Sequence, residues 1–257
     1  MLSSSITLVA VPGIPHVHAG DDVAALLLDA LGRAGLALQD GDVIAIAQKI
    51  VSKAEGRQVR LADVTPSARA VELAGQVGKD ARLMELILRE SVEVSRLRPG
   101  VIIVRHRLGF TSANAGIDRS NVQLDGGEEE AVLLLPLDPD ASAVSLCAAL
   151  RATTGAAVGV VITDSHGRPF RLGTVGVAIG VAGLPALWDR RGEADLYGYR
   201  LQHTDVGLAD EIAAAAGLLM GQAAEGRPAV LIRGLRLPEA EGRATDLVRP
   251  PELDLYR

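Results

Sequence analysis

Val158-Gly-Val-Val-Ile-Thr163 is an apolar, β-branched run that leads directly into the octet Asp164-Ser-His-Gly-Arg-Pro-Phe-Arg171. The run predicts a buried strand, because a strand covered on both faces reads as continuous apolar residues. The octet then places a carboxylate and a hydroxyl at the end of that strand, before a Gly-Arg-Pro turn and a second arginine. Oxygen atoms suit a hard divalent cation, and guanidinium groups suit phosphate or carboxylate. The bland alternative is a polar loop capped by Asp164.

Patterns on either side of this strand alternate between strands and helices at irregular intervals. Further extended segments are expected at residues 6–11, 43–50, 101–105, 131–135, 173–184 and 228–232. Helices are expected at residues 20–33 (with Asp21 as N-cap), 66–77, 81–94, 139–153 and 205–220. A doubly wound sheet would show more regular βαβ units, so the pattern favours an α+β fold with mixed sheets in two interleaved lobes.

No repeat or linker divides the chain, so one domain over residues 1–257 is expected. Its polar tail, from about residue 237, should be loosely held. The acidic segment Leu124–Glu130 is expected to be a solvated turn rather than a metal cluster.

Composition limits the partners and the compartment. The net charge is −6 and aromatic residues make up 2%, which gives no basis for nucleic-acid binding. The single cysteine, Cys147, lies in an apolar helical stretch and excludes a disulfide framework. No signal peptide opens the chain, and no apolar run approaches the roughly 20 residues of a membrane span. A cytoplasmic protein with neither nucleic acid nor membrane as partner is therefore expected.

A second polar segment, Leu108–Asn121, is rich in small residues that let a ligand approach the backbone. Asp118 and Asn121 would share a face if the segment turned helically, whereas an Asx-rich turn would bond its own backbone. Both readings stay open from the sequence. Paired with Asp164, Asp118 would supply the two carboxylates of a one- or two-metal phosphate site.

Two shorter strings also leave alternatives open. Lys53 follows an expected strand and could contact phosphate, although a charged surface turn is the commoner reason for such a string. The chain has neither a P-loop motif nor a Gly-x-Gly-x-x-Gly opening a helix after a strand. Asp195-Leu-Tyr-Gly-Tyr199 holds two of the three tyrosines and could line an aromatic pocket or form a packed turn.

Eight ordered motifs between residue 6 and Arg236 together resemble one family, the coenzyme F420-0:L-glutamate ligases (F420 gamma-glutamyl ligases). This family includes the N-terminal domain of the two-domain actinobacterial enzyme. The motifs are Pro12-Gly-Ile-Pro15 with Gly20-Asp-Asp22, Asp40-Gly-Asp42, Ser52-Lys-Ala-Glu-Gly-Arg57, Asn114-Ala-Gly-Ile-Asp-Arg-Ser-Asn121, Leu135-Pro-Leu-Asp-Pro-Asp140, Asp164 to Arg171, Ala178-Ile-Gly180 and Asp210-Glu-Ile-Ala213.

The resemblance implies a GTP-dependent amide ligase of coenzyme F420 biosynthesis. Such an enzyme joins L-glutamate to F420-0, a deazaflavin phosphodiester, and then extends a gamma-linked glutamate tail, releasing GDP and phosphate. The family uses Mg²⁺ or Mn²⁺, with two ions expected here, is helped by K⁺, and forms an intertwined homodimer. Activation of the acceptor carboxylate as an acyl phosphate is the expected chemistry.

The resemblance also implies roles for individual residues. The metal positions are Asp118, Asp164 and Ser165. The nucleotide positions are Ile14, Pro15, His16, Val17, Lys53 and Asn121. Gln48 and Lys49 align with a further nucleotide contact whose residue identity varies in the family. Lys53, Arg168 and Arg171 are the catalytic candidates, because their charges could stabilise the transferring phosphoryl group.

Departures from the family pattern concern the reductase-like second domain of the actinobacterial enzyme, which this chain lacks, and Gln222. Gln222 stands where at least one member has an acidic residue, so it is left out of the metal set. His166 has the right chemistry for a general base, but the position varies in the family. A metal-dependent phosphohydrolase using Asp118 and Asp164 is the alternative function, and a non-catalytic deazaflavin carrier is a third.

Overall fold

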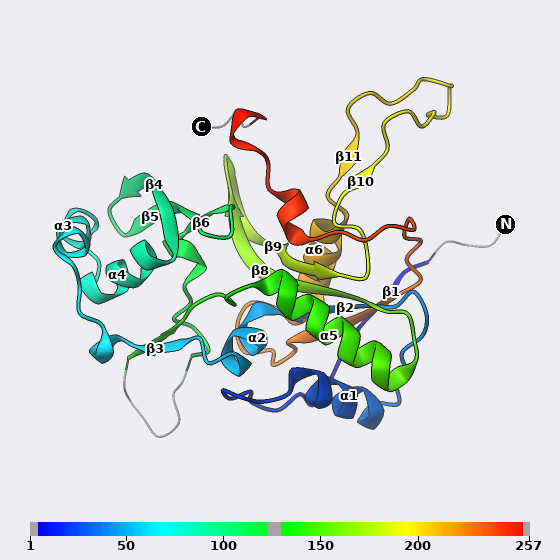
Figure 1. The fold of residues 1–257 in the computed structure, drawn as a ribbon, viewed down its shortest axis with the longest axis horizontal. Coiled ribbons are helices and arrows are strands. Elements are labelled where there is room, and N and C mark those ends of the chain that lie inside the picture. Colours follow the sequence, from blue (N-terminus) through cyan, green and yellow to red (C-terminus); the bar gives the residue numbers. More distant parts are fainter. Residues whose placement is uncertain (1–4, 123–129, 254–257) are drawn as a thin grey trace.

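The computed structural model describes residues 5–122 and 130–253 and has an α+β fold around a mixed central sheet (Figure 1). The five strands run in the order β1-β12-β2-β8-β9. Their bounds are Thr7–Ala10 (β1), Ala229–Arg233 (β12), Val43–Ala47 (β2), Gly159–Arg168 (β8) and Arg171–Ala182 (β9). Strands β2 and β8 pair in parallel, whereas the other neighbours are antiparallel. The apolar runs that predicted strands are therefore confirmed as the centre of the fold.

Both faces of this sheet are buried. In β2, Ile44 and Ile46 join one apolar cluster while Val43 and Ala45 join another. The first cluster includes residues of α1 (Val23–Arg33), α2 (Gln48–Ala54) and α5 (Pro139–Thr154), whereas α6 (Leu208–Met220) packs on the second. Side chains alternate between faces along a strand, so two covered faces require apolar residues at every position. Cys147 is buried in the first cluster, as predicted.

A second lobe lies beside this sheet and has its own apolar cluster, formed by residues between Leu61 and Leu134. The chain enters it after α2 and leaves it before α5. Its elements are β3 (Gln58–Arg60), η1 (Leu61–Asp63), α3 (Ala68–Val77), α4 (Ala81–Arg89), β4 (Ser91–Arg98), β5 (Val101–His106), β6 (Thr111–Ala113), η2 (Asn114–Gly116) and β7 (Ala131–Leu133). Strands β3 and β7 pair with each other, and β4, β5 and β6 form a small sheet. Interleaving of the lobes and a dimer stay predictions.

An extended arm projects from the main lobe (Figure 1). Its base is the pair β10 (Trp188–Asp189) and β11 (Asp205–Val206). Tyr197, toward its tip, is 95% exposed, so the aromatic-pocket and packed-turn readings of this segment are both wrong in the single chain. Asp195 shapes the tip by accepting the backbone N–H groups of Tyr197 and Tyr199. Two 3₁₀ turns, η3 (Ala244–Leu247) and η4 (Pro251–Leu253), follow β12.

Several predicted boundaries are wrong. Asp22 rather than Asp21 caps α1, through a bond from the Ala25 N–H to Asp22 Oδ1 at 3.0 Å. The strand expected through Ile50 ends at Ala47, because Ile50 and Val51 belong to a helix, α2, and are buried on its inner face. The helix expected at 81–94 ends at Arg89 and gives way to β4, and the helix expected from residue 205 begins at Leu208.

The octet and the tail also differ from expectation. Strand β8 continues through Arg168 and β9 begins at Arg171, so the octet lies on a two-stranded hairpin and not in a loop. The tail is anchored as far as Leu247, since Ala244 is buried and its N–H donates to Asp140 Oδ1 at 2.8 Å. The predicted turn at Leu124–Glu130 lies outside the described residues except for Glu130. Among the described residues, no helix combines the length and apolarity needed to cross a membrane.

Candidate active site

The candidate site lies where the parallel pairing of β2 and β8 ends, at Ala47 and Thr163. Ala47 and Thr163 are register partners, so Gln48 and Asp164 are the next residues along the two strands. In α/β folds, ligands bind outside the carboxyl ends of parallel strands, because both chains deliver their following residues to one edge. The parallel pair therefore brings the start of α2 next to the start of the octet.

Asp118 reaches this edge from the second lobe. Gln48 Nε2 donates to Asp118 Oδ2 at 2.8 Å, and Lys49 Nζ lies 2.6 Å from the same oxygen. Ser52 Oγ in turn donates to Gln48 Oε1 at 2.8 Å. Gln48 and Ser52 are both buried, and this chain of bonds accounts for two polar side chains in an apolar surrounding. Sequence reasoning gave Gln48 and Lys49 no part in holding Asp118.

The two predicted metal-binding carboxylates share one electrostatic environment. Burial raises the pKa of Asp118; Lys49 opposes this, and the negative charge of Asp164 raises it further. Asp118 and Asp164 are therefore close enough to repel each other. A divalent cation would relieve that repulsion, and carboxylate oxygens are its preferred ligands. Across the described residues, no group of three or more His, Cys, Asp or Glu side chains forms a metal cluster, so hydroxyl, amide or phosphate oxygens would have to complete the coordination.

Side chains alternate between the two faces of β8, so neighbouring residues of the octet point in opposite directions. Asp164, His166 and Arg168 are partly buried, whereas Ser165 between them is exposed. The register between Asp164 and His166 is regular, so the Ser165 side chain points to the opposite face from the Asp164 side chain. Of the predicted metal ligands, the fold thus brings together Asp118 and Asp164. The Ser165 hydroxyl lies on the other side of β8.

His166 contacts the neighbouring side chains on its face of β8. Its Nε2 lies 3.0 Å from Asp164 Oδ2, and its ring lies 4.9 Å from the Phe110 ring. These contacts orient Asp164 and its neighbours. Arg168 Nε is buried and has no hydrogen-bond partner among the described residues, which leaves it available to an anion. Arg171, its register partner at the end of the hairpin, is exposed.

The loop before Asp118 has an unusual backbone. Asn114, Ala115 and Gly116 have φ angles of 52°, 54° and 65°, and Asn121 has 56°. Positive φ is uncommon for residues other than glycine, and asparagine tolerates it best. The segment is therefore neither the helical turn nor the simple Asx turn considered from the sequence. Asp118 leaves it as a β-bridge, exchanging backbone bonds with Leu133 at 2.9 Å in each direction.

The predicted nucleotide-binding residues surround α2. Gly20 N donates to Ala54 O at 2.8 Å, which fastens the loop containing Ile14, Pro15, His16 and Val17 to the end of this helix. Ile14 and Val17 pack into the core, whereas Pro15 and His16 are exposed. At the other end, Lys49 Nζ bonds Ser120 O at 3.2 Å, next to Asn121. Asn121 Nδ2 donates to Ala223 O at 2.9 Å, which ties this loop to the segment after α6.

Lys53 is within α2 and not in a surface turn. Burial lowers the pKa of Lys53, and the charge of Lys49 one turn away lowers it further. No carboxylate of the described residues forms an ion pair with Lys53. Its positive charge is therefore uncompensated within the described structure, which favours an anionic ligand such as phosphate.

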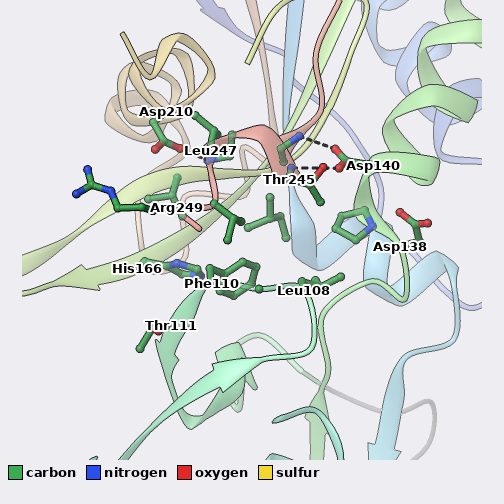
Figure 2. A pocket seen from close by; sticks show the side chains of 17 residues that line it. Leu108, Phe110, Thr111, Asp138, Asp140, His166, Asp210, Thr245, Leu247 and Arg249 are labelled. Atoms are coloured by element: carbon green, nitrogen blue, oxygen red, sulfur yellow. Dashed lines mark hydrogen bonds between the residues drawn. The ribbon is translucent and has the colours of Figure 1, made fainter. Parts of the chain in front are cut away.

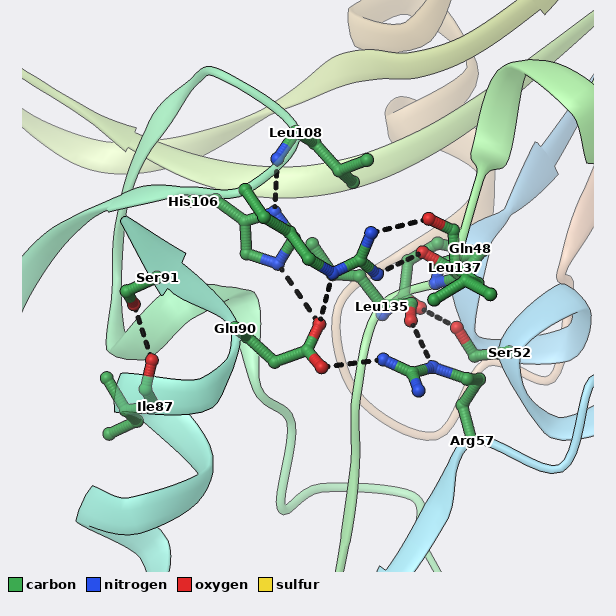
Figure 3. A network of polar contacts seen from close by, with 12 residues as sticks. Gln48, Ser52, Arg57, Ile87, Glu90, Ser91, His106, Leu108, Leu135 and Leu137 are labelled. Carbon is green, nitrogen blue, oxygen red and sulfur yellow. Dashed lines mark hydrogen bonds and ion pairs between the residues drawn. The ribbon is translucent and has the colours of Figure 1, made fainter. Parts of the chain in front are cut away.

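A cluster of charged side chains joins the two lobes beside this site (Figure 3). Glu90 accepts from Arg57 Nη2 at 2.8 Å and from Arg107 Nε at 2.9 Å. His106 Nδ1 accepts from Leu108 N, so its Nε2 carries the proton, and this atom lies 3.5 Å from Glu90. Burial raises the pKa of Glu90, but the contact with His106 and the hydrogen bond from Arg57 lower it more, to about 2. His106 also stacks on Phe110, with ring centroids 5.2 Å apart.

A cavity of about 260 Å³ is lined in part by His166, whose Nε2 lies 3.0 Å from Asp164 Oδ2 (Figure 2). It is enclosed by the turn after β5, the start of α5, β9, the start of α6 and the C-terminal segment. Its lining residues are Leu108, Gly109, Phe110, Thr111, Asp138, Pro139, Asp140, His166, Val177, Ala178, Ile179, Asp210, Ala244, Thr245, Leu247, Val248 and Arg249. Sequence reasoning did not predict this cavity, because its walls come from segments far apart in the chain.

Comparison with known proteins identifies the family. A family model described as F420-0:Gamma-glutamyl ligase matches residues 13–234. The chain belongs to this family. Coenzyme F420:L-glutamate ligase of Methanothermobacter thermautotrophicus is 50% identical over 98% of this chain and 99% of its own length. The proteins of the same name from Methanopyrus kandleri and Archaeoglobus fulgidus are 47% and 44% identical, each over 96% of this chain and over 96% and 94% of their own lengths.

The resemblance inferred from the ordered motifs is thus confirmed over most of the chain, and the chain is a ligase of coenzyme F420 biosynthesis. The family match gives no support to the phosphohydrolase alternative. The roles of the individual site residues stay predictions, which the geometry above makes testable.

Proposed function

We propose that this protein is a GTP-dependent ligase that joins L-glutamate to F420-0 and then adds further gamma-linked glutamates. The family description supplies the acceptor, F420-0, and the relatives' names supply the amino acid, L-glutamate. The observation that carries the proposal is the approach of Asp118, paired with Lys49, to Asp164 where the parallel pairing of β2 and β8 ends, with Lys53 one helical turn from Lys49. Paired carboxylates near Lys53, which has no ion pair among the described residues, suit a metal–phosphate substrate.

Amide formation from a carboxylate requires activation, because a carboxylate is a poor electrophile. A carboxylate oxygen of F420-0 would attack the γ-phosphorus of GTP, the bond to the β–γ bridging oxygen would break, and GDP would leave. The glutamate amine, after losing a proton, would attack the acyl carbon of the resulting acyl phosphate. Breakage of the carbon–oxygen bond then releases inorganic phosphate and leaves the amide.

Different residues of this chain would bind the metal ions, the phosphoryl group and the substrates. Asp118 and Asp164 would hold one Mg²⁺ or Mn²⁺ ion, and Ser165, on the other face of β8, would contact a second; the ions would supply charge neutralisation to the phosphate oxygens. Lys53 and the unpartnered Arg168 would bind the phosphoryl group as it transfers, and exposed Arg171 would attract the anionic substrates. The loop of Ile14, Pro15, His16 and Val17 would bind GTP together with Lys53 and Asn121. K⁺ is proposed as an accessory ion.

A homodimer is also part of the proposal. Large apolar side chains are exposed on two hairpins: Phe170 and Leu172 on β8–β9 are 95% and 98% exposed, and Leu196 on the arm is 97% exposed. Exposed apolar side chains that gather on projecting segments mark contact surfaces. Analytical ultracentrifugation should give twice the chain mass. A measured mass of one chain at micromolar concentration would reject the proposed homodimer.

The ligase activity is tested by incubating the protein with F420-0, GTP, L-glutamate and Mn²⁺. Mass spectrometry should show F420 species heavier by whole glutamates, with one GDP and one phosphate per amide. Asp164→Ala should abolish turnover, whereas Asp29→Asn on the exposed face of α1 should not. No product from verified substrate rejects the ligase. Phosphate release that ignores glutamate indicates a phosphohydrolase, and tight F420-0 binding without any dependence on GTP or Mn²⁺ indicates a carrier.

A further inference from the structure

The cavity beyond His166 has one carboxylate that lacks a full set of partners. Asp210, in the first turn of α6, accepts the Ala178 N–H through Oδ1 at 2.8 Å. Asp210 is partly buried, and Oδ2 has no bonding partner among the described residues. Burial raises the pKa of Asp210, and the neighbouring His166 acts in the opposite sense. A bound cationic group would complete the bonding of this carboxylate.

The two other carboxylates of the cavity wall differ from Asp210. Asp140 accepts three backbone N–H groups, from Val181 at 2.9 Å, Ala244 at 2.8 Å and Thr245 at 3.4 Å, so it fastens α5 to β9 and to the C-terminal segment. Asp138 caps α5 and is exposed to water. Asp210 is therefore the carboxylate of this wall that combines partial burial with a free oxygen.

A free cation accompanies it. Arg249 lines the same cavity and forms no hydrogen bond or ion pair with a described residue. Figure 2 labels Asp210 and Arg249 on the same side of the view, where the exposed Arg249 directs its guanidinium outward from the other lining side chains, at the mouth of the cavity. Aliphatic walls separate the polar groups, with Val177, Ile179 and Leu247 among them. An anionic oxygen for an ammonium group, a guanidinium for a carboxylate and aliphatic walls for a short chain are the features that recognise an amino-acid zwitterion.

Size and charge make this cavity a poorer fit for the larger substrates. Its volume of about 260 Å³ is below the roughly 300–1,000 Å³ typical of pockets for drug-sized ligands, so it fits a small metabolite better than a deazaflavin phosphodiester. Phosphate groups would also face the carboxylates of Asp138, Asp140 and Asp210. The nucleotide residues surround α2, whereas none of the cavity residues belongs to that helix.

We propose that this cavity binds the amino-acid substrate, with Asp210 holding its ammonium group and Arg249 a carboxylate. The inference rests on the proposed function, under which the amino acid is L-glutamate. Its position suits the reaction: His166 lines the cavity and bonds Asp164, so the bound amine would stand one side chain away from the carboxylate pair.

Asp210→Asn tests the ammonium contact. The asparagine can still accept the Ala178 N–H through its amide oxygen, so the fold should be kept, but its charge is gone. The KM for L-glutamate should rise at least about tenfold, as expected for loss of a charge-assisted bond, while the KM values for GTP and F420-0 change less than about twofold. Glu211→Gln is the matched control, because it removes an exposed charge from the same first turn of α6. An unchanged KM for glutamate in Asp210→Asn overturns the inference.

Calorimetric binding separates this inference from the ligase activity. L-Glutamate should bind the wild-type protein more tightly than glutarate, which has the same two carboxylates and no ammonium group. Asp210→Asn should weaken the binding of glutamate but not that of glutarate, which loses only a repulsion, whereas Arg249→Met should weaken the binding of both. Equal losses for both ligands in Asp210→Asn, or no binding of glutamate to wild type, would reject the cavity assignment. These measurements test amino-acid binding even if no ligase product forms. If Asp210→Asn does not fold, Arg249→Met still tests whether the cavity binds the amino acid.

Discussion

Glu90 and Asp118 are two mainly buried carboxylates that stand in opposite electrostatic surroundings. Glu90 faces Arg57, Arg107 and His106, and its pKa is lowered to about 2. Asp118 has the ammonium of Lys49 but also the repulsion of Asp164, and its pKa is raised by burial and by that repulsion. A carboxylate with two guanidinium partners stabilises the fold, whereas a carboxylate that has one ammonium partner and is repelled by a second carboxylate favours the binding of a cation. The comparison distinguishes a structural charge cluster from a functional one.

The largest expected effect follows from Asp118→Asn. The amide can still accept from Gln48 but cannot balance a divalent cation, so turnover should fall by about 100-fold or more. The free energy of unfolding should change by less than about 1 kcal/mol, because the substitution also removes the repulsion from Asp164. Steady-state kinetics and urea denaturation measure the two quantities. A large loss of stability with turnover kept per folded molecule would reverse the assignment of Asp118 as the functional carboxylate.

Glu90→Gln should have the opposite profile. It leaves the guanidinium groups of Arg57 and Arg107 without their carboxylate, so the free energy of unfolding should fall by about 3 kcal/mol. Turnover per folded molecule should change far less than in Asp118→Asn. Glu93→Gln, on exposed β4, is a matched control that should alter stability little. Stability equal to wild type in Glu90→Gln would show that the cluster does not join the lobes.

Acid titration should reveal the same cluster. The pKa of Glu90 is about 2 in the folded chain against an ordinary value of 4.5, so its contribution to stability is complete above about pH 4.5 and is lost as the pH falls through about 2. Between these values the free energy of unfolding should decline by up to about 1.4 kcal/mol per pH unit from this one proton. Glu90→Gln should remove that part of the slope in urea denaturation series, and an identical slope would contradict it.

The smallest effect is expected from Ser165→Ala. A hydroxyl is a neutral ligand, and strand alternation places it across β8 from the Asp164 side chain. Turnover should therefore fall by less than about tenfold, with a change confined to the metal dependence, measured by titrating Mn²⁺. A loss as large as that of Asp118→Asn would show that both faces of β8 hold essential ions.

Much of the architecture was predictable from local patterns. The run Val158–Thr163 predicted its strand because both of its faces are buried, and the helices at 139–153 and 66–77 were found with small changes at their ends. Predictions failed where one apolar pattern suits two structures. Ile50 and Val51 continue the apolar run of a strand, yet they belong to helix α2, where they are buried. Val94 continues the apolar pattern of α4 but belongs to β4.

The sequence by itself determined the family, the acidic and cationic residues available for phosphate chemistry, and the apolar runs that build the central sheet. Only the tertiary structure decided which of those residues meet. The parallel register of β2 and β8 puts Gln48 next to Asp164, the second lobe brings Asp118 to Gln48 and Lys49, and strand alternation separates Ser165 from Asp164. The cavity with Asp210 and Arg249 likewise needs α6, β9 and the C-terminal segment together. Local patterns report burial and periodicity, whereas a site depends on long-range pairing that no single segment encodes.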